Sequence, residues 1–174
     1  MAAFGRIDIL INNAGASAFA PFDEYPDRYW EMCINLDLSA VYYMSQKVGL
    51  VMKANGGGKI VNMASIAATG AGRGPIVYTI SKHAMLGLTR ELAFFAGHMN
   101  INVNAILPGG VATEMIAEAL NDETNPAVQL IKASPAERPA EPREIARVAV
   151  FLASDDASFP HGEGITADGG FTLL

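Results

Sequence analysis

Ile7-Asp8-Ile9-Leu10-Ile11-Asn12 is a short, mostly apolar run that ends directly in the turn-forming residues Asn13-Ala14-Gly15. Three later segments have the same character, namely Lys59–Ala64, Ile101–Leu107 and the short Gly164–Ala167. Apolar, β-branched runs without strict alternation are typical of strands that are covered on both faces. The sequence therefore predicts four buried parallel strands, each followed by small or turn-forming residues.

Helical patterns separate these strands. We expect helices over Pro26–Cys33, Leu38–Ala54, Pro75–Gly97 and Glu141–Ala153, each with apolar residues at spacings of three and four or with a proline at its start. The stretch Thr113–Pro139 contains several prolines and predicts a mobile flap rather than a packed element. A repeated strand–helix–strand order predicts an α/β fold, a doubly wound parallel sheet with right-handed crossovers and helices on both faces.

Composition narrows the class of protein. The 174 residues fit one domain, which we assign to residues 1–174, and 51% hydrophobic against 17% charged residues indicates a globular chain. A net charge of -6 argues against nucleic acid as a partner. The single Cys33 leaves no disulfide framework and no structural zinc site, so we predict no metal and a reducing, cytoplasmic location. No apolar stretch reaches the length of a membrane span, so we expect a soluble protein with no membrane partner.

Three groups of residues follow the predicted strands at their carboxyl ends. They are Asn13-Ala14-Gly15, Ser65 and Pro108-Gly109-Gly110. Ligands of parallel α/β sheets bind beyond the carboxyl ends of the strands. We therefore expect these residues to line one crevice.

Tyr78 and Lys82 lie four residues apart in the longest predicted helix, and thus one turn apart on the same face. A free tyrosine is a poor proton donor or acceptor near neutral pH, and a nearby ammonium is expected to lower its pKa. Ser65 could hydrogen-bond the same substrate oxygen. Proton transfer at oxygen, paired with hydride transfer at the attached carbon, is the chemistry of carbonyl reduction, and the hydride must come from a nicotinamide.

In order and spacing, these motifs resemble the short-chain dehydrogenase/reductase family across nearly the whole chain. The matching residues are Asn12-Asn13-Ala14-Gly15, Asn35, Ser65, Tyr78-x-x-x-Lys82, Pro108-Gly109 with Val111 and Thr113, and the closing Gly162 and Asp168-Gly169-Gly170. Tyr-x-x-x-Lys alone is a weak signal, but six motifs in the right order are a strong one. Within the family, the sequence is similar to 3-oxoacyl-carrier-protein reductases and to related sugar or steroid dehydrogenases. This resemblance implies a Rossmann-like fold.

The resemblance implies roles for individual residues. Tyr78 would be the general acid/base, Lys82 would tune it and hold the nicotinamide ribose, Ser65 would orient the substrate carbonyl, and Asn35 would hold a water of a proton relay. The cofactor, NAD or NADP, would be bound by Asn12, Ala14, Gly15, Tyr78, Lys82, Pro108, Gly109, Val111 and Thr113. The backbone at Val111 and the hydroxyl of Thr113 would hold the nicotinamide carboxamide. The substrate would be a small carbonyl compound or alcohol.

The sequence departs from the family pattern at its start. Members of the family open with a strand, a glycine-rich Thr-Gly-x-x-x-Gly-x-Gly turn and a helix whose N-terminus meets the pyrophosphate. This chain begins at a segment that in the family leads into the fourth strand, so about two βαβ units are expected to be missing. A fragment of a longer reading frame, an alternative start and a truncated paralogue all fit, and we favour the first because the retained motifs match so fully. In each case, the strand at Ile7–Asn12 would have an open edge.

Two further interpretations stay open at this point. In the family, the helices at 38–54 and 75–97 pair across a dimer axis, which implies a homodimer or homotetramer. A chain without the glycine-rich turn could therefore act as a non-catalytic oligomerisation partner, or be a non-functional gene fragment.

Overall fold

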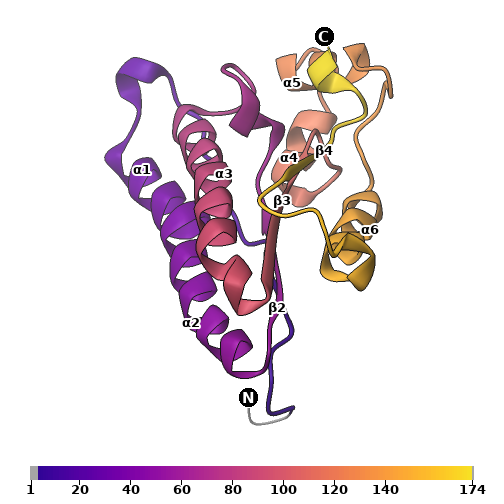
Figure 1. Ribbon diagram of the computed structural model, residues 1–174. Helices are drawn as coiled ribbons and strands as arrows, with labels where there is room; N and C mark the ends of the chain where they lie inside the picture. Colours follow the sequence, from indigo (N-terminus) through magenta and orange to yellow (C-terminus); the bar gives the residue numbers. More distant parts are fainter. Residues whose placement is uncertain (1–3, 174) are drawn as a thin grey trace.

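The computed structural model describes residues 4–173, except for the side chain of Pro126. Within them lies one parallel sheet in the order β1-β2-β3-β4 (Figure 1). Its strands are β1 (Ile9–Asn12), β2 (Gly58–Met63), β3 (Ile101–Pro108) and β4 (Gly164–Ala167). The predicted α/β class and all four strands are confirmed. β1 begins two residues later than predicted, and the bounds of β2 are shifted by one residue.

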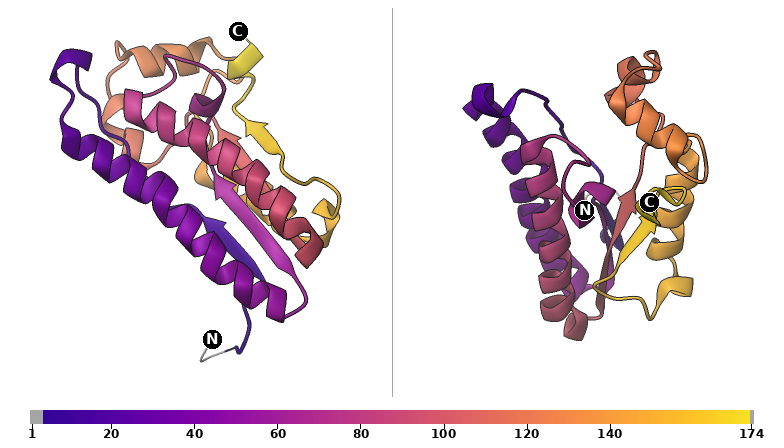
Figure 2. Two further views of the ribbon diagram at one scale, coloured as in Figure 1. Left: turned by 60° about the vertical axis from the view of Figure 1, so that its left-hand side comes forward. Right: turned by 90° about the horizontal axis from the view of Figure 1, so that it is seen from above.

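Helices cover both faces of the sheet, as Figure 2 shows in the view from above. One face is covered by α2 (Ala40–Ala54) and α3 (Ile76–Ala96), whose apolar residues pack with Ile60 and Val103. The opposite face is covered by α6 (Pro142–Ala153), which packs against Val61 and Ile106. Neighbouring residues of a strand point to opposite faces, so Ile60 and Val61 belong to different halves of the core. No helix among residues 4–173 is both long and apolar enough to cross a membrane.

The predicted gap between the first two helices does not exist. α1 (Asp27–Ile34) continues through a π-helical turn, Asn35–Ser39, directly into α2. The Ala40 N–H donates to the Asn35 carbonyl, five residues back, which is the π-helical pattern. Asn35 is therefore inside a continuous helix and not a cap between two helices. Such single π turns are common at functional sites.

The expectation that β1 is covered on both faces is wrong. Leu10 and Asn12 face α2 and α3, but Ile9 and Ile11 point to the other face and are 47% and 44% exposed. The physical reason is the position of α6, whose apolar residues pack over β2 and β3 and do not reach β1. In the described part of the chain β1 pairs with β2 alone, so its outer edge is open, as the sequence predicted.

The stretch predicted to be an unpacked flap contains two short helices, α4 (Glu114–Leu120) and α5 (Pro126–Ala133). α5 packs through the buried side chains of Val128 and Ile131. The prolines that suggested disruption lie at helix boundaries, since Pro126 opens α5 and Pro135 follows its end. Proline is well tolerated at a first turn and just after a helix. These residues therefore mark the ends of α5 and do not interrupt it.

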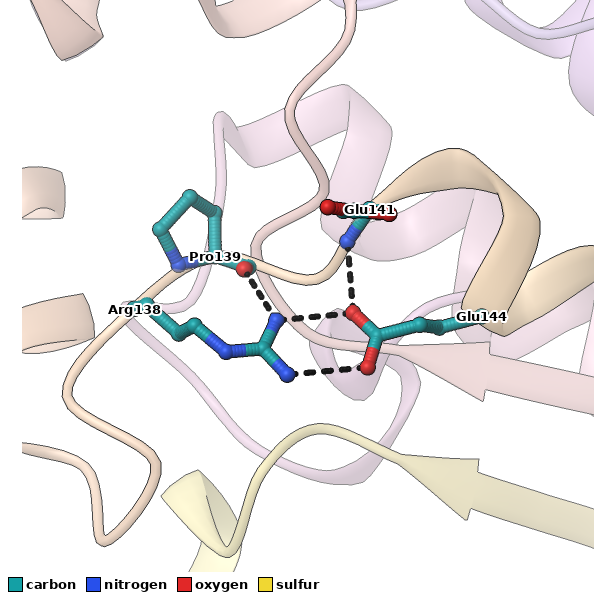
Figure 3. Close-up of polar contacts among 4 residues, drawn as sticks. All are labelled: Arg138, Pro139, Glu141 and Glu144. Carbon is teal, nitrogen blue, oxygen red and sulfur yellow. Dashed lines mark hydrogen bonds and ion pairs between the residues drawn. The ribbon is translucent and has the colours of Figure 1, made fainter.

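The end of this segment is tied to the start of α6 by a cluster of charges (Figure 3). The two terminal nitrogens of the Arg138 guanidinium donate to the Glu144 carboxylate, at 2.7 and 2.8 Å. One of them also donates to the Pro139 carbonyl. The same carboxylate accepts from the Glu141 N–H at 2.8 Å, as part of a capping box at the helix start. These contacts fix the angle at which the segment meets α6.

The same contacts predict a pH-dependent stability. The hydrogen bonds from Arg138 and the Glu141 backbone lower the pKa of Glu144 from 4.5 to about 2. Because the folded-state pKa lies below the unfolded one, the carboxylate stabilises the fold above about pH 4.5, and this contribution disappears as the pH falls through about 2. We expect Glu144→Gln to unfold at a lower temperature than the parent at neutral pH and at the same temperature below pH 2, measured by circular dichroism. The exposed Glu118→Gln is the control, and an equal difference at both pH values would contradict the prediction.

Candidate active site

The carboxyl ends of the strands meet at one edge of the sheet, as predicted. Asn12 of β1 pairs with Asn62 of β2, and Met63 pairs with Ile106 of β3. The chain segments that leave these strands, 13–16, 64–66 and 109–111, therefore begin side by side. Ser65, in extended conformation, lies two residues after the end of β2 and starts a short 3-10 turn, Ile66–Thr69.

Ser65 and Tyr78 are brought together. Ser65 is buried, and its hydroxyl accepts from the Ala67 N–H at 3.1 Å, which fixes its rotamer. The Tyr78 phenol, in the first turns of α3, is close enough to Ser65 for this side chain to lower its pKa. A residue that follows a strand end and a residue at a helix start are thus neighbours, as needed for two groups that bind the same substrate oxygen.

The expected pKa of Tyr78 is wrong in direction. Burial raises the pKa of the phenol, the hydrogen bond from Ser65 lowers it in part, and the Asp37 carboxylate and Cys33 raise it further. Removal from water disfavours the phenolate, and here this effect outweighs the stabilisation of charge. In this structure Tyr78 is therefore a protonated phenol at neutral pH, which is the form that donates a proton.

Lys82 lies beneath the Tyr78 ring. Its side chain is only 3% exposed, and its ammonium is 5.3 Å from the ring centroid, within range of a cation–π contact. Nζ donates to the Met63 carbonyl at 3.0 Å, at the end of β2. Burial lowers the pKa of Lys82, while the negative charge of Asp37 and the Cys33 thiol raise it. The ammonium lies over the ring, and the effect of burial on the phenol outweighs the attraction of this positive charge for the phenolate.

Asp37 is a site residue that the sequence reasoning missed. It lies in the π-helical turn with no exposed surface. One carboxylate oxygen accepts from the Ala16 N–H at 2.8 Å, and the other accepts from the Ser81 hydroxyl at 3.0 Å. Asp37 therefore joins the turn after β1 to the helix that carries Tyr78 and Lys82. A signal was present, because a lone carboxylate in the otherwise apolar stretch 36–41 needs a buried partner.

Asn35 is not brought to the other three residues. It is exposed, and its side chain makes no hydrogen bond with any of the residues 4–173. Its backbone N–H donates to the carbonyls of Glu31 and Met32, and its carbonyl accepts from Ala40. The relay role of Asn35 stays a prediction.

The predicted cofactor residues after β1 divide into three environments. The Asn12 amide points into the core, where it donates to Ser45 Oγ and Asn62 Oδ1, at 3.1 and 2.8 Å. Ala14 is exposed at the surface. Gly15 lies against the site, since a Cβ there would be 3.2 Å from Asp37 Oδ1 and 3.4 Å from Lys82 Nζ. The absence of a side chain at Gly15 is thus what allows these two charges to approach.

The predicted cofactor residues after β3 form a separate strip. Pro108 is buried at the strand end, and the Gly109 N–H donates to the Ala167 carbonyl of β4 at 3.1 Å. A Cβ on Gly109 would be 2.9 Å from Asp168 Cα, so glycine is required there. The Val111 carbonyl accepts from the N–H and the hydroxyl of Thr113, at 2.8 and 3.3 Å. Among the described residues the Val111 N–H has no acceptor.

No three His, Cys, Asp or Glu side chains within the described range are arranged to hold a metal ion. Cys33 is a fully buried free thiol that donates to the Ala16 carbonyl at 3.6 Å. The carboxylate of the closing Asp168 accepts from the N–H groups of Gly170 and Thr172, so Asp168 acts as a turn residue.

Comparison with known proteins gives consistent matches. D-threitol dehydrogenase of Mycolicibacterium smegmatis is 42% identical over 99% of this chain and 65% of its own length. NAD-dependent glycerol dehydrogenase of Listeria innocua is 39% identical over 98% of this chain and 66% of its own length. The crystal structure of a gluconate 5-dehydrogenase from Burkholderia cenocepacia, in complex with NADP and tartrate, superimposes with a TM-score of 0.92 at 34% identity, and the match covers 99% of this chain and 68% of that one.

The chain thus spans about two thirds of the length of the curated relatives it matches. Residues 1–172 match the sequence family described as Enoyl-(Acyl carrier protein) reductase. The match covers almost every residue, and the fold agrees with the resemblance noted from the sequence. The chain belongs to this family of short-chain dehydrogenases/reductases.

Proposed function

We propose that the chain carries the catalytic residues of an NAD(P)-dependent oxidoreductase, which transfers a hydride between a nicotinamide and a carbonyl compound or secondary alcohol. The observation that carries this proposal is the arrangement around Tyr78, where Ser65 is close enough to act on the pKa of the phenol and the Lys82 ammonium lies 5.3 Å from the centroid of the ring. Two hydroxyls that converge at a strand end, beside a buried cation, suit an oxygen that gains negative charge during the reaction.

Each residue has a role that follows from its protonation state. In the direction of reduction, protonated Tyr78 donates its proton to the carbonyl oxygen, while Ser65 holds that oxygen by a hydrogen bond. The positive charge of Lys82 stabilises the phenolate that is left. In the direction of oxidation, Tyr78 takes the proton from the alcohol. A bound nicotinamide supplies or accepts the hydride.

Several groups fit the nicotinamide half of a dinucleotide. The Lys82 ammonium has one hydrogen bond to protein and further N–H groups for a ribose hydroxyl. The free N–H of Val111 and the exposed Thr113 hydroxyl suit a carboxamide. We leave the choice between NAD and NADP open, since one relative is named for NAD and one neighbouring structure holds NADP.

The carbonyl or alcohol class of the substrate is supported by the relatives, which are named for polyols, a sugar acid, hydroxysteroids and acetoacetyl-CoA. The loop 67–74 and the segment 113–139 connect the core elements, and they are the part of the chain expected to select among such substrates. We include in the proposal that residues 1–174 act as one domain in a cytoplasmic setting, which the buried, unpaired Cys33 supports.

A second function is favoured by the exposed apolar side chains of α2 and α3. Tyr43, Leu50, Phe94 and Phe95 are each at least 59% exposed. Apolar patches of this kind mark protein interfaces. They support association of the chain through helices 38–54 and 75–97, as a homodimer or homotetramer. This association would serve a catalytic chain and a non-catalytic oligomerisation partner alike. Sedimentation equilibrium of the parent and of Phe94→Ser tests this, and a monomer at all concentrations would contradict it.

Dinucleotide binding separates the enzyme from the non-catalytic partner. We expect calorimetric titration of the purified chain with NADH and with NADPH to show saturable binding of at least one of them. Lys82→Met should weaken this binding, because the ribose contact is lost, whereas Lys132→Met, at an exposed ion pair with Glu123, should leave it unchanged. A folded chain that binds neither dinucleotide would favour the non-catalytic partner.

A further inference from the structure

Among the described residues, Asp37 is the only buried carboxylate and Lys82 the only buried ammonium, with 0% and 3% exposure. A charged group inside a protein is strongly destabilising unless an opposite charge or several hydrogen bonds compensate it. Both charges occupy the same small region, between the turn after β1, the π-helical turn and α3. Their proximity therefore calls for an explanation beyond packing.

The two charges do not form a direct ion pair within the described part of the chain. Both lie next to Gly15, where a Cβ would be 3.2 Å from Asp37 Oδ1 and 3.4 Å from Lys82 Nζ. The distance between the two charged atoms is therefore no larger than the sum of these two distances. At such a separation in a poorly solvated region, opposite charges still attract each other appreciably.

The hydrogen bonds of Asp37 hold its charge in place. The Ala16 N–H binds one oxygen and the Ser81 hydroxyl binds the other, so the carboxylate is anchored to the turn and to α3 at once. The single O–H of Ser81 is shared between Asp37 and the Tyr78 carbonyl, at 3.0 and 2.8 Å, which places Ser81 in the helix turn between Tyr78 and Lys82. Both donors stabilise an ionised carboxylate more than a protonated one.

We propose that Asp37 is a positioning residue that serves as the counter-charge of Lys82 across Gly15, and so keeps the buried ammonium protonated beneath the Tyr78 ring. Its consequence for catalysis rests on the function proposed above, but its effect on Lys82 does not. Burial alone lowers the pKa of Lys82, and the charge of Asp37 opposes that change. The other ionisable groups that face Lys82 are the Cys33 thiol of α1 and the Tyr78 phenol of α3.

The test reads the protonation of Lys82 directly, without nucleotide or substrate. The chain has five lysines, so labelling with lysine enriched in carbon-13 at Cε gives few signals, and that of Lys82 is identified by its absence in Lys82→Arg. In the parent we expect an ammonium throughout the neutral range. In Asp37→Asn, which keeps the shape and an acceptor for Ala16, the titration midpoint of Lys82 should fall by about 1–3 pH units.

Ser81→Ala is the matched control, because it removes a hydrogen bond from Asp37 and leaves the charge. Its Lys82 midpoint should stay close to that of the parent. An unchanged midpoint in Asp37→Asn, or an equal fall in Ser81→Ala, would overturn the proposal. If Asp37→Asn does not fold, the double variant Asp37→Asn/Lys82→Met should restore the fold, since no buried charge is left without its partner. A double variant as unfolded as the single one would show that Asp37 acts through packing, and would overturn the proposal as well. A chain that binds no dinucleotide would leave these results intact, so the two proposals fail separately.

Discussion

In the Tyr78→Phe variant, carbonyl reduction is expected to fall by about 10²–10⁴-fold, while dinucleotide binding stays unchanged. The substitution removes only the hydroxyl that donates the proton. The ring remains, and with it the contact to the Lys82 ammonium 5.3 Å from its centroid. The loss should therefore lie in kcat. The measurement is the rate of NADH or NADPH oxidation with a ketone substrate, together with a calorimetric titration of the dinucleotide.

Tyr43→Phe is the matched control, since Tyr43 is an exposed tyrosine of α2 whose hydroxyl makes no hydrogen bond within residues 4–173. It loses the same atom and should retain full turnover. Turnover by Tyr78→Phe at the rate of this control would end the mechanistic proposal. A proportional loss of dinucleotide binding in Tyr78→Phe would instead assign the phenol a binding role.

The raised pKa of Tyr78 predicts a pH dependence that differs from the one expected from the charge of Lys82 alone. With its pKa raised by burial, Tyr78 stays protonated across neutral pH, which is the form that donates in reduction, and it must lose this proton before it can accept one in oxidation. The sequence reasoning considered only the charge of Lys82 and predicted the opposite direction. The sequence alone does not reveal how far the phenol is removed from water. It also does not show that the ammonium lies under the ring with a hydrogen bond to Met63.

The strands were predictable because β2 and β3 are covered on both faces and contain continuous apolar runs. β1 has the same composition, but the lateral extent of α6 decides that Ile9 and Ile11 are exposed, and no local pattern encodes that extent. The π-helical turn at 35–39 is similar in kind. The one extra residue of this turn interrupts the apolar spacing of the helix. The sequence pattern therefore favours two helices with a gap between them.

The three residues of the site that were predicted together are those that follow directly from topology or helix spacing. Ser65 comes at a strand end, and Tyr78 and Lys82 are one helical turn apart. Asp37 was not predicted, because its partners, Ala16 and Ser81, lie 21 and 44 residues away in the sequence. Long-range hydrogen bonds of this kind become visible only when the packing of helices is known.

The buried amide of Asn62 is the position where a single substitution should destabilise the fold most. Asn62 has no exposed surface, although it lies in the middle of the apolar strand β2. Its Oδ1 accepts from Asn12 at 2.8 Å, and its Nδ2 donates to Thr89 Oγ1 of α3 at 2.9 Å. The network thus links two strands to a helix, and through Asn12 it also fixes the end of β1, from which the turn toward Gly15 and Asp37 begins.

We expect Asn62→Leu to lower the free energy of unfolding by about 2–4 kcal/mol, because it leaves an Asn12 donor and a Thr89 acceptor without a partner in the core. Chemical denaturation followed by circular dichroism measures this loss, and Asn121→Leu, at an exposed helix end, should change stability little. Adding Thr89→Val to Asn62→Leu should cost less than the sum of the two single effects, since the stranded hydroxyl is then removed. Additive losses, or a cost no greater than that of Asn121→Leu, would show that these amides fill space in the core without anchoring the strand end, and the site would need another explanation for its rigidity.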